Sequence, residues 1–181
     1  AGYALRIKYD YDHGVLNKVS DYNQTSTIFW RLNAVDARGN ALDESLGTAS
    51  PVIGVISGFD PLTGLIDYRT AGTDSGYINR QNLSFEWDDN GNLKKRIDGN
   101  QSVTEEFFYD GLDRLDYSTR NTVTNFNINY SLNGNVTYRS DYYQGGSFSY
   151  STRPHAVTSV SGSNGCLGWQ EDFTYDANGN Q

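Results

Sequence analysis

A short phrase recurs along the chain, and this repetition constrains the fold more than any other feature. F-E-W-D-D-N-G-N-L from Phe85 returns near the end as F-T-Y-D-A-N-G-N-Q. The aligned copies are Y-D-H-G-V-L from Tyr11, V-D-A-R-G-N-A-L from Val35, F-D-P-L-T-G-L from Phe59, W-D-D-N-G-N-L from Trp87, Y-D-G-L-D-R-L from Tyr109, Y-S-L-N-G-N-V from Tyr130 and Y-D-A-N-G-N-Q from Tyr175. A degenerate copy lies around Tyr150. Spacings of 20 to 28 residues indicate a repeat architecture with one structural unit per copy.

Apolar side chains alternate with polar ones before each phrase, as at Leu83, Phe85 and Trp87. A period of two places such side chains on one face of a strand. After the phrase, residues such as Leu93 and Ile97 resume a strand, and no segment of useful length has a helical period. Each copy therefore predicts a β-hairpin whose turn is the phrase itself.

The middle of each phrase is rich in Asp, Asn and Gly, the residues that form turns. The Asn-Gly pairs at 90–91, 133–134 and 178–179 are expected to supply the positive φ angles of a tight hairpin. The aspartate carboxylate can accept hydrogen bonds from backbone N–H groups two or three positions further on. The predicted structural turn residues are Asp12, Gly14, Asp36, Gly39, Asp60, Gly64, Asp88, Gly91, Asp110, Gly134, Asp176 and Gly179.

Seven or eight hairpins over residues 1–181 give about 14 strands, more than an open twisted sheet usually holds before it curls. We therefore predict an all-β fold: a single array of antiparallel β-hairpins forming a long curled or spiralling sheet. Loops are expected over 71–82, 140–147 and 161–168, which are rich in Gly, Ser, Asn or Asp. The chain opens and closes in mid-phrase, so we expect it to be a fragment of a larger protein.

Charge and composition argue against several classes of protein. The net charge is −8 and the longest basic run is Lys94-Lys95-Arg96, so no nucleic-acid partner is expected. No apolar stretch approaches membrane-spanning length and the first residues lack the layout of a signal peptide, so no membrane insertion is expected. The single cysteine, Cys166, cannot form an internal disulfide.

The combined motifs resemble the tyrosine–aspartate (YD) repeats of a known family. Besides the phrases, W-R-L-N-A-V-D-A-R-G-N from Trp30 and R-P-H-A-V-T-S-V from Arg153 carry the resemblance. The sequence is similar to the rearrangement-hot-spot (Rhs) proteins and to the C component of insecticidal toxin complexes, and more distantly to teneurins. In that family the repeats form a strip of hairpins that winds into a hollow shell around a toxin domain.

The resemblance implies that the chain is a non-enzymatic piece of such a wall, secreted or at the cell surface as part of a larger exported protein. Its implied partners are the remaining repeats and an enclosed toxin domain. The family's toxin domain and its Asp-based self-cleavage motif are missing from this sequence. Asp60-Pro61-Leu62-Thr63-Gly64 is superficially similar to that motif, but it occupies the repeat's own Asp position and is therefore expected to be a turn.

Calcium is the main rival interpretation of the phrase, because 88–92 places oxygens at alternating positions. A helix–loop–helix calcium loop also requires a bidentate Glu at its twelfth position. Counting from the first five phrase aspartates, that position falls on Asn23, Gly47, Ala71, Gly99 and Asn121. One Cys and two His are too few for a zinc site. No metal or other cofactor is expected.

Catalytic interpretations find little support in the sequence. Cys166 and His155 could form a nucleophile and a base, but nothing indicates a third residue that would orient them. Paired carboxylates such as Glu105-Glu106 are sequence neighbours, which point to opposite faces of a strand rather than toward one substrate. No catalytic residue is predicted.

Two kinds of contact remain open. Trp169, Tyr142 and Tyr143 lie in or beside predicted loops and could bind a glycan, whereas Trp30 and Trp87 are expected in the core. A wall segment should bury its largest aromatic side chains between strands, while a glycan-binding surface should expose rings flanked by Asp or Asn. In addition, unpaired strand edges recruit other chains, so self-association through strand edges is expected.

Overall fold

The computed structural model describes residues 4–48, 51–73, 76–142, 145–151, 153–163, 167–177 and 179. Within these ranges the regular structure consists of fifteen β-strands, and no helix is found. The described part of the chain thus offers no helix that could cross a membrane. The all-β class built from antiparallel hairpins is confirmed.

The chain divides into two compact units, Ala1–Thr104 and Glu105–Gln181, and the division falls within β9. The strands up to that division are β1 (Ile7–Asp12), β2 (Val15–Asp21), β3 (Ile28–Val35), β4 (Ala41–Leu46), β5 (Ile53–Phe59), β6 (Ile66–Gly72), β7 (Gln81–Trp87) and β8 (Leu93–Asp98). The others are β9 (Val103–Tyr109), β10 (Leu115–Arg120), β11 (Val123–Tyr130), β12 (Val136–Arg139), β13 (Gly146–Tyr150), β14 (Val157–Ser163) and β15 (Gly168–Asp172).

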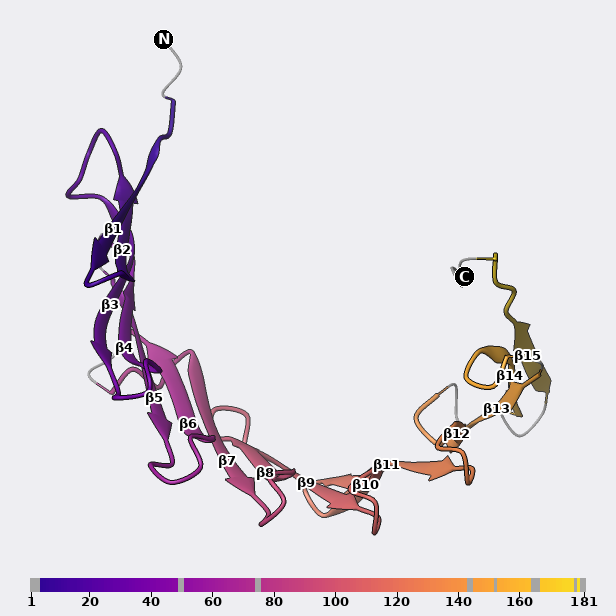
Figure 1. Cartoon of the computed structure of the whole chain (residues 1–181). Helices are drawn as coiled ribbons and strands as arrows, with labels where there is room; N and C mark the ends of the chain where they lie inside the picture. Colours follow the sequence, from indigo (N-terminus) through magenta and orange to yellow (C-terminus); the bar gives the residue numbers. More distant parts are fainter. Residues whose placement is uncertain are drawn as a thin grey trace. The chain divides into compact units, whose positions relative to one another are not determined.

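Each unit is an antiparallel meander. In the first unit every strand from β1 to β8 pairs with the next strand along the chain. In the second, the same holds from β9 to β15. Figure 1 shows the successive hairpins of each meander. The order follows from the repeat, because each phrase reverses the chain and the next copy lies beside the previous one.

The three connections predicted as loops are shorter than the sequence predicts. β6 extends to Gly72 and β7 begins at Gln81, which takes residues at both ends of the expected loop 71–82 into strands. β13 likewise begins at Gly146 and β14 extends to Ser163. Backbone pairing with the neighbouring strand continues through these Gly- and Ser-rich positions, although their composition favours loops.

The two faces of the first unit differ in polarity. Residues in register across neighbouring strands share a face. One such row is Tyr9, Val19, Trp30, Leu46 and Ile53, and the row beside it on the opposite face is Asp10, Lys18, Arg31, Ser45 and Gly54. On the polar face the Asp10 carboxylate lies 2.7 Å from Lys8 Nζ and 2.9 Å from Lys18 Nζ.

Little of the apolar surface is fully buried. Among the described residues the buried hydrophobic side chains are Val55, Ile128 and Val160. Trp30 and Trp87, which the sequence places in a core, are only half-buried. The expectation of buried tryptophans was wrong because each meander is a single layer, whose apolar side chains are covered only by neighbours on the same face.

A β-bulge follows the turn in each copy for which both strands are described, and the sequence does not predict it. Glu86 pairs with Lys95 and Trp87 pairs with Leu93, so Lys94 is an extra residue in β8. The equivalent extra residues in the other hairpins are Asn17, Leu42, Asp67, Asp116, Thr137 and Thr158. Such bulges bend the strand and increase its local twist.

Candidate functional site

The recurring aspartate forms the frame of the turn, as the hairpin β7–β8 shows. The Asp88 carboxylate accepts hydrogen bonds from the backbone N–H groups of Asn90 at 3.0 Å and Asn92 at 2.8 Å. The Asn92 side chain also donates to Oδ2 of Asp88 at 3.0 Å. Two backbone bonds close the turn, from Gly91 N to Asp88 O and from Asp88 N to Asn92 O, both 3.0 Å long.

The same frame recurs at three other tips. In each, Oδ1 of the aspartate accepts two or more hydrogen bonds from N–H groups of the turn, at 2.6 to 3.0 Å. The acceptors and donors are Asp36 with Arg38 and Asn40, Asp60 with Leu62 and Thr63, and Asp110 with Leu112 and Arg114. These bonds support the turn role that the sequence predicts for the aspartates.

The second carboxylate oxygen distinguishes the four tips. Oδ2 accepts a side-chain hydrogen bond from Asn40 at Asp36, from Asn92 at Asp88 and from Arg114 at Asp110. At Asp60 the third bond, from the Thr63 hydroxyl, goes to Oδ1 like the two backbone bonds. Within the described residues, Asp60 is therefore the one member of this set whose Oδ2 has no such donor.

These contacts keep the aspartates ionised. Hydrogen bonds from Asn40 lower the pKa of Asp36, and those from Thr63 lower the pKa of Asp60. Partial burial raises the pKa of Asp88, but the hydrogen bonds from Asn92 and its neighbours outweigh it and the pKa is lowered. The Arg114 side chain lowers the pKa of Asp110 to about 2.

All six predicted turn glycines have positive φ angles, between 77° and 86°; they are Gly14, Gly39, Gly64, Gly91, Gly134 and Gly179. The expectation for the Asn-Gly pairs needs correction, because Asn90 and Asn133 do not have positive φ. The Asp-x-Asn-Gly-Asn turn needs a left-handed residue only at Gly, before the strand resumes. In β9–β10 a non-glycine residue, Asp113, holds this position with φ 57°.

The remaining predicted turn aspartates are Asp12 and Asp176. Asp12 precedes a two-residue turn, His13-Gly14, in which both φ angles are positive, and its carboxylate lies 2.7 Å from His13 Nδ1. Asp176 accepts a backbone hydrogen bond from Gly179 at 3.1 Å through its carbonyl oxygen. Arg153 donates to the same carbonyl oxygen from both terminal nitrogens, at 3.1 Å.

In four copies the aromatic residue of the phrase links one repeat to the one before it. Trp87 Nε1 donates to the Ile66 carbonyl at 2.8 Å, and the Tyr130 hydroxyl donates to the Leu115 carbonyl at 2.9 Å. Tyr150 and Tyr175 make the same contact with Val136 and Val157, at 2.8 and 3.0 Å. In each case the backbone ladder between the two repeats has ended and the side chain supplies the next donor.

Neighbouring tips are also joined directly. Arg38, in the β3–β4 tip, donates to the carbonyl oxygens of Pro61 and Leu62 in the β5–β6 tip, at 3.0 and 2.9 Å. Asn135 donates to the Pro154 carbonyl, and His155 Nδ1 lies 2.7 Å from Asn135 Oδ1. His155 thus has a structural contact, whereas Cys166, with which it could have formed a nucleophile and base, lies outside the described residues.

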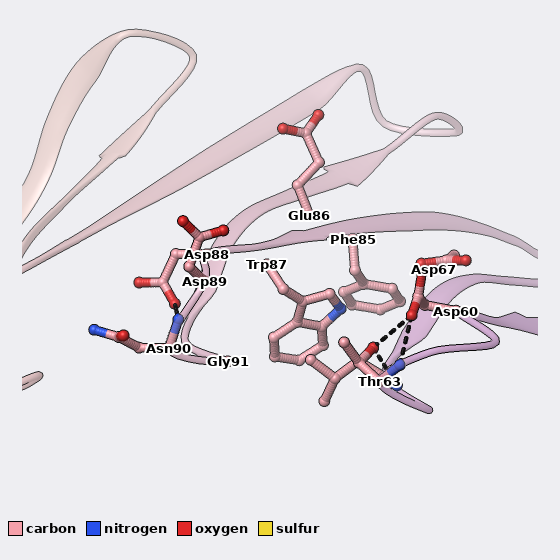
Figure 2. Close-up of a pocket in the computed structure, with 11 residues that line it drawn as sticks. Asp60, Thr63, Asp67, Phe85, Glu86, Trp87, Asp88, Asp89, Asn90 and Gly91 are labelled. Atoms are coloured by element: carbon pink, nitrogen blue, oxygen red, sulfur yellow. Dashed lines mark hydrogen bonds between the residues drawn. The ribbon is translucent and has the colours of Figure 1, made fainter.

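A cleft of about 840 Å³ opens between the tips of β5–β6 and β7–β8. Its lining combines two aromatic rings with carboxylates: Asp60, Thr63, Leu65, Asp67, Phe85, Glu86, Trp87, Asp88, Asp89, Asn90 and Gly91. Figure 2 shows the rings of Phe85 and Trp87 side by side, facing the tip that carries Asp60 and Thr63, while Glu86 points away from them. The ring centroids lie 6.5 Å apart and the planes are 25° from parallel.

The predicted glycan contacts are partly brought together. The rings of Tyr142 and Trp169 lie 5.8 Å apart, and the Tyr142 hydroxyl donates to Glu171 Oε2 at 3.1 Å. Both rings are half-buried, and Tyr142 also packs on Phe148 at 5.5 Å. Tyr143 lies outside the described residues. Among the described residues, no three His, Cys, Asp or Glu side chains lie together where they could hold a metal ion.

The chain matches no protein-family model and no curated protein. It does match solved structures. The TcdB2–TccC3 complex without its hypervariable C-terminal region aligns with 96% of this chain at a TM-score of 0.68 and 16% identity. A second TcdB2–TccC3 structure aligns over the same 96% at a TM-score of 0.67. The chain spans 10% of the length of each matched chain.

At 16% sequence identity the match establishes the fold alone. The chain has the fold of a segment of the TcdB2–TccC3 toxin complex, and its resemblance to the YD-repeat and Rhs proteins is confirmed at the level of the fold.

Proposed function

We propose that the chain is a non-enzymatic structural module, one stretch of the β-hairpin wall of an Rhs-like shell that encloses a secreted or injected toxin domain. The observation that carries this proposal is the side-chain link between consecutive repeats, which recurs at Trp87, Tyr130, Tyr150 and Tyr175. Because this hydrogen bond recurs from hairpin to hairpin, it stabilises the packing of the hairpins against one another. It does not mark a single catalytic site.

The turn contacts support the same role. The aspartate carboxylates at the four best-framed tips are engaged with backbone N–H groups of their own turns. A carboxylate held in this way is poorly placed to act as a base or a metal ligand. The recurring aspartates therefore act as turn formers in this proposal, without catalytic or cofactor chemistry.

The partners in this proposal are the remaining repeats of a longer exported protein and the toxin domain that they enclose. The chain spans 10% of the structures it matches, which is consistent with one stretch of a longer wall. In this proposal residues 1–181 belong to a single repeat array, which folds as two compact units. Location outside the producing cell follows from the same proposal.

Imaging and proteolysis of the full-length protein that contains this chain test the proposal. We expect electron microscopy to reveal a hollow shell with internal density, and the enclosed segment to resist protease. Replacing Trp87 and Tyr130 together by alanine should open the wall and expose that segment. A full-length protein whose downstream segment is digested as fast in the intact protein as in the variant contradicts the shell.

A glycan-binding or adhesive surface is the alternative function, favoured by the Tyr142–Trp169 pair beside Glu171. Aromatic faces flanked by a carboxylate suit sugar recognition, because the ring stacks on the sugar and the carboxylate accepts from its hydroxyls. Glycan-array binding that is lost in Trp169→Ala, with the circular dichroism spectrum retained, would support this function. An array signal at background level for the native chain would exclude it.

Self-association is proposed for the chain on its own. β1 and β15 each pair with one neighbouring strand in the described sheet order, so each has one edge available for another chain. We expect the sedimentation coefficient to rise with concentration. A concentration-independent monomer would contradict this part of the proposal.

A further inference from the structure

The cleft between the β5–β6 and β7–β8 tips carries unbalanced charge. Five acidic residues, Asp60, Asp67, Glu86, Asp88 and Asp89, belong to its lining, and no Lys or Arg does. The Glu86 side chain points away from the rings of Phe85 and Trp87 (Figure 2). Lys95 Nζ lies 3.4 Å from Glu86, which balances one of the five carboxylates. Arg38, at the neighbouring tip, is engaged with the Pro61 and Leu62 carbonyls and does not line the cleft.

The same place in the second unit can be identified by hydrogen bonds. Asp60 N donates to Leu65 O as Asp110 N donates to Arg114 O, both at 2.9 Å. Leu65 in the first unit is therefore equivalent to Arg114 in the second. The aromatic link confirms the alignment one residue further on, because Trp87 binds the Ile66 carbonyl as Tyr130 binds the Leu115 carbonyl.

In the second unit a guanidinium group fills this place. Arg114 Nη2 lies 2.6 Å and Nε 2.7 Å from Asp110 Oδ2. The central carbon of the same guanidinium lies 4.4 Å from the centroid of the Tyr130 ring. One cation thus satisfies the second oxygen of the turn aspartate and stacks on the aromatic residue of the next repeat.

In the first unit no Lys or Arg lines the cleft, although the charge of Arg38 at the neighbouring tip contributes to lowering the pKa of Asp60. Leu65 has no charge to place on Trp87, and Asp60 Oδ2 lacks the side-chain donor that Asp36, Asp88 and Asp110 have. Tryptophan is the strongest cation–π partner among the aromatic residues. Asp67, the exposed bulge residue of β6, adds a further carboxylate at the cleft.

We propose that this cleft binds the guanidinium group of an arginine presented by another polypeptide, in the place that Arg114 occupies in the second unit. The arginine stacks on Trp87 and donates to Asp60 and Asp67. The cleft is a recognition site for an arginine-bearing peptide segment, and it does not depend on the chain forming a shell.

Binding can be measured by following the Trp87 indole N–H resonance in a titration at low salt. The probe is the peptide Ac-Gly-Arg-Gly-NH2, and its control contains citrulline, which has the shape of arginine without the charge. We expect saturable shifts at Trp87 and at the Leu62 and Thr63 amides, with the citrulline peptide about tenfold weaker or more. Equal shifts with the two peptides, or with glucose at the same concentration, would overturn the proposal.

Two substitutions in the β5–β6 tip distinguish binding of the peptide in the cleft from general attraction of a cationic peptide to an acidic surface. Leu65→Arg should fill the cleft with the chain's own guanidinium and abolish peptide binding. Leu62→Arg places the same charge on a side chain that is 86% exposed and does not line the cleft, so binding should fall less than about threefold. Equal losses in the two variants would contradict a site in the cleft.

A substitution at Arg114 tests whether this residue and Leu65 occupy equivalent places in the two tips. Arg114→Leu removes the guanidinium from Tyr130, and we expect a second binding site for the peptide to form there. Shifts of the amide resonances of Leu112 and of residue 114 would detect it. Asp67→Asn should weaken the first site severalfold, while the exposed Asp116→Asn, at the equivalent bulge, should leave it unchanged. An Arg114→Leu protein that stays folded and still binds at Trp87 alone would contradict the equivalence.

Discussion

The tips of β5–β6 and β9–β10 share a frame and differ in their electrostatics. In both, the aspartate accepts backbone hydrogen bonds through Oδ1, and an aromatic side chain of the next repeat binds the carbonyl at the start of the second strand. In β9–β10 the second oxygen is held by Arg114, whereas in β5–β6 the equivalent residue is Leu65. The aspartate and aromatic contacts are thus retained although the β5–β6 turn is one residue longer, and the charge at the residue before the second strand differs.

This difference indicates where function can diversify in such an array. The positions that shape the tip are the aspartate, the left-handed residue and the aromatic residue. The position between the left-handed residue and the second strand carries Leu65 in one tip and Arg114 in the other without altering the aromatic link. Substitutions at the shaping positions should therefore cost stability, and substitutions at the variable position should change binding.

Removal of the aromatic residue should have the largest effect. Trp87→Ala deletes a half-buried ring and its hydrogen bond to Ile66, and we expect the free energy of unfolding to fall by about 2–4 kcal/mol. Tyr130→Ala should cost a similar amount, because it also leaves the Arg114 guanidinium without its ring. Urea denaturation measures both changes, and a loss below about 0.5 kcal/mol in either variant would contradict the proposed link.

Substitutions at the residue with positive φ should change the free energy of unfolding less than removal of the aromatic residue. The change should be a loss at Gly64 and a gain at Asp113. Gly64 has φ +77°, and an added Cβ would lie 2.2 Å from Arg38 Nη1, so Gly64→Ala should destabilise by about 1–2 kcal/mol. Asp113→Gly should stabilise the other tip, because glycine adopts φ 57° without strain. Gly111→Ala is the control, since its Cβ would meet open space.

The hydrogen bond of the aromatic link can be tested separately from the ring. Tyr130→Phe keeps the ring on Arg114 but leaves the Leu115 carbonyl without its donor, which should cost about 1 kcal/mol of unfolding free energy. Tyr9→Phe, at a tyrosine that is 56% exposed, is the matched control and should change stability little. Equal effects of the two substitutions would show that the hydroxyl of Tyr130 is not a structural contact.

The smallest effect should be the acid dependence of the β9–β10 tip. The pKa of Asp110 in the folded chain is about 2, below the ordinary value of 3.8, so its contribution to stability is complete above pH 3.8 and is lost as the pH falls toward 2. Arg114→Gln removes the main cause of the shift. The Asp110 carboxyl, followed by NMR, should then titrate closer to its ordinary pKa, and an unchanged titration would refute the assigned cause.

Local features of these tips could be predicted from the sequence. Alternation at Leu83, Phe85 and Trp87 predicted the strand β7, and the phrase predicted the reversal and the left-handed glycine at Gly91. Both follow from the preferences of neighbouring residues, which a single sequence records. The left-handed Asp113 was not foreseen, because the sequence places no glycine at that position.

Features that depend on the register between strands could not be predicted. The bulge at Lys94 changes which residues pair but leaves the alternating pattern on either side. The bond from Trp87 to Ile66 and the contact of Arg114 with Tyr130 join residues of different repeats, so they appear only when the repeats are placed side by side. The recurrence of Tyr or Trp, both of which carry a hydrogen-bond donor, was the available signal for the aromatic link.

The central claim is that the recurring aspartates shape turns and bind no metal, and a calcium titration tests it most directly. Amide spectra of the chain would be recorded with and without millimolar Ca²⁺, following Asn90 and Asn92, whose N–H groups bind Asp88, and Leu62 and Thr63, whose N–H groups bind Asp60. We expect these resonances to stay in place and to exchange slowly with solvent. Saturable shifts confined to the tips would mean that the carboxylates are metal ligands, and the structural account would be wrong.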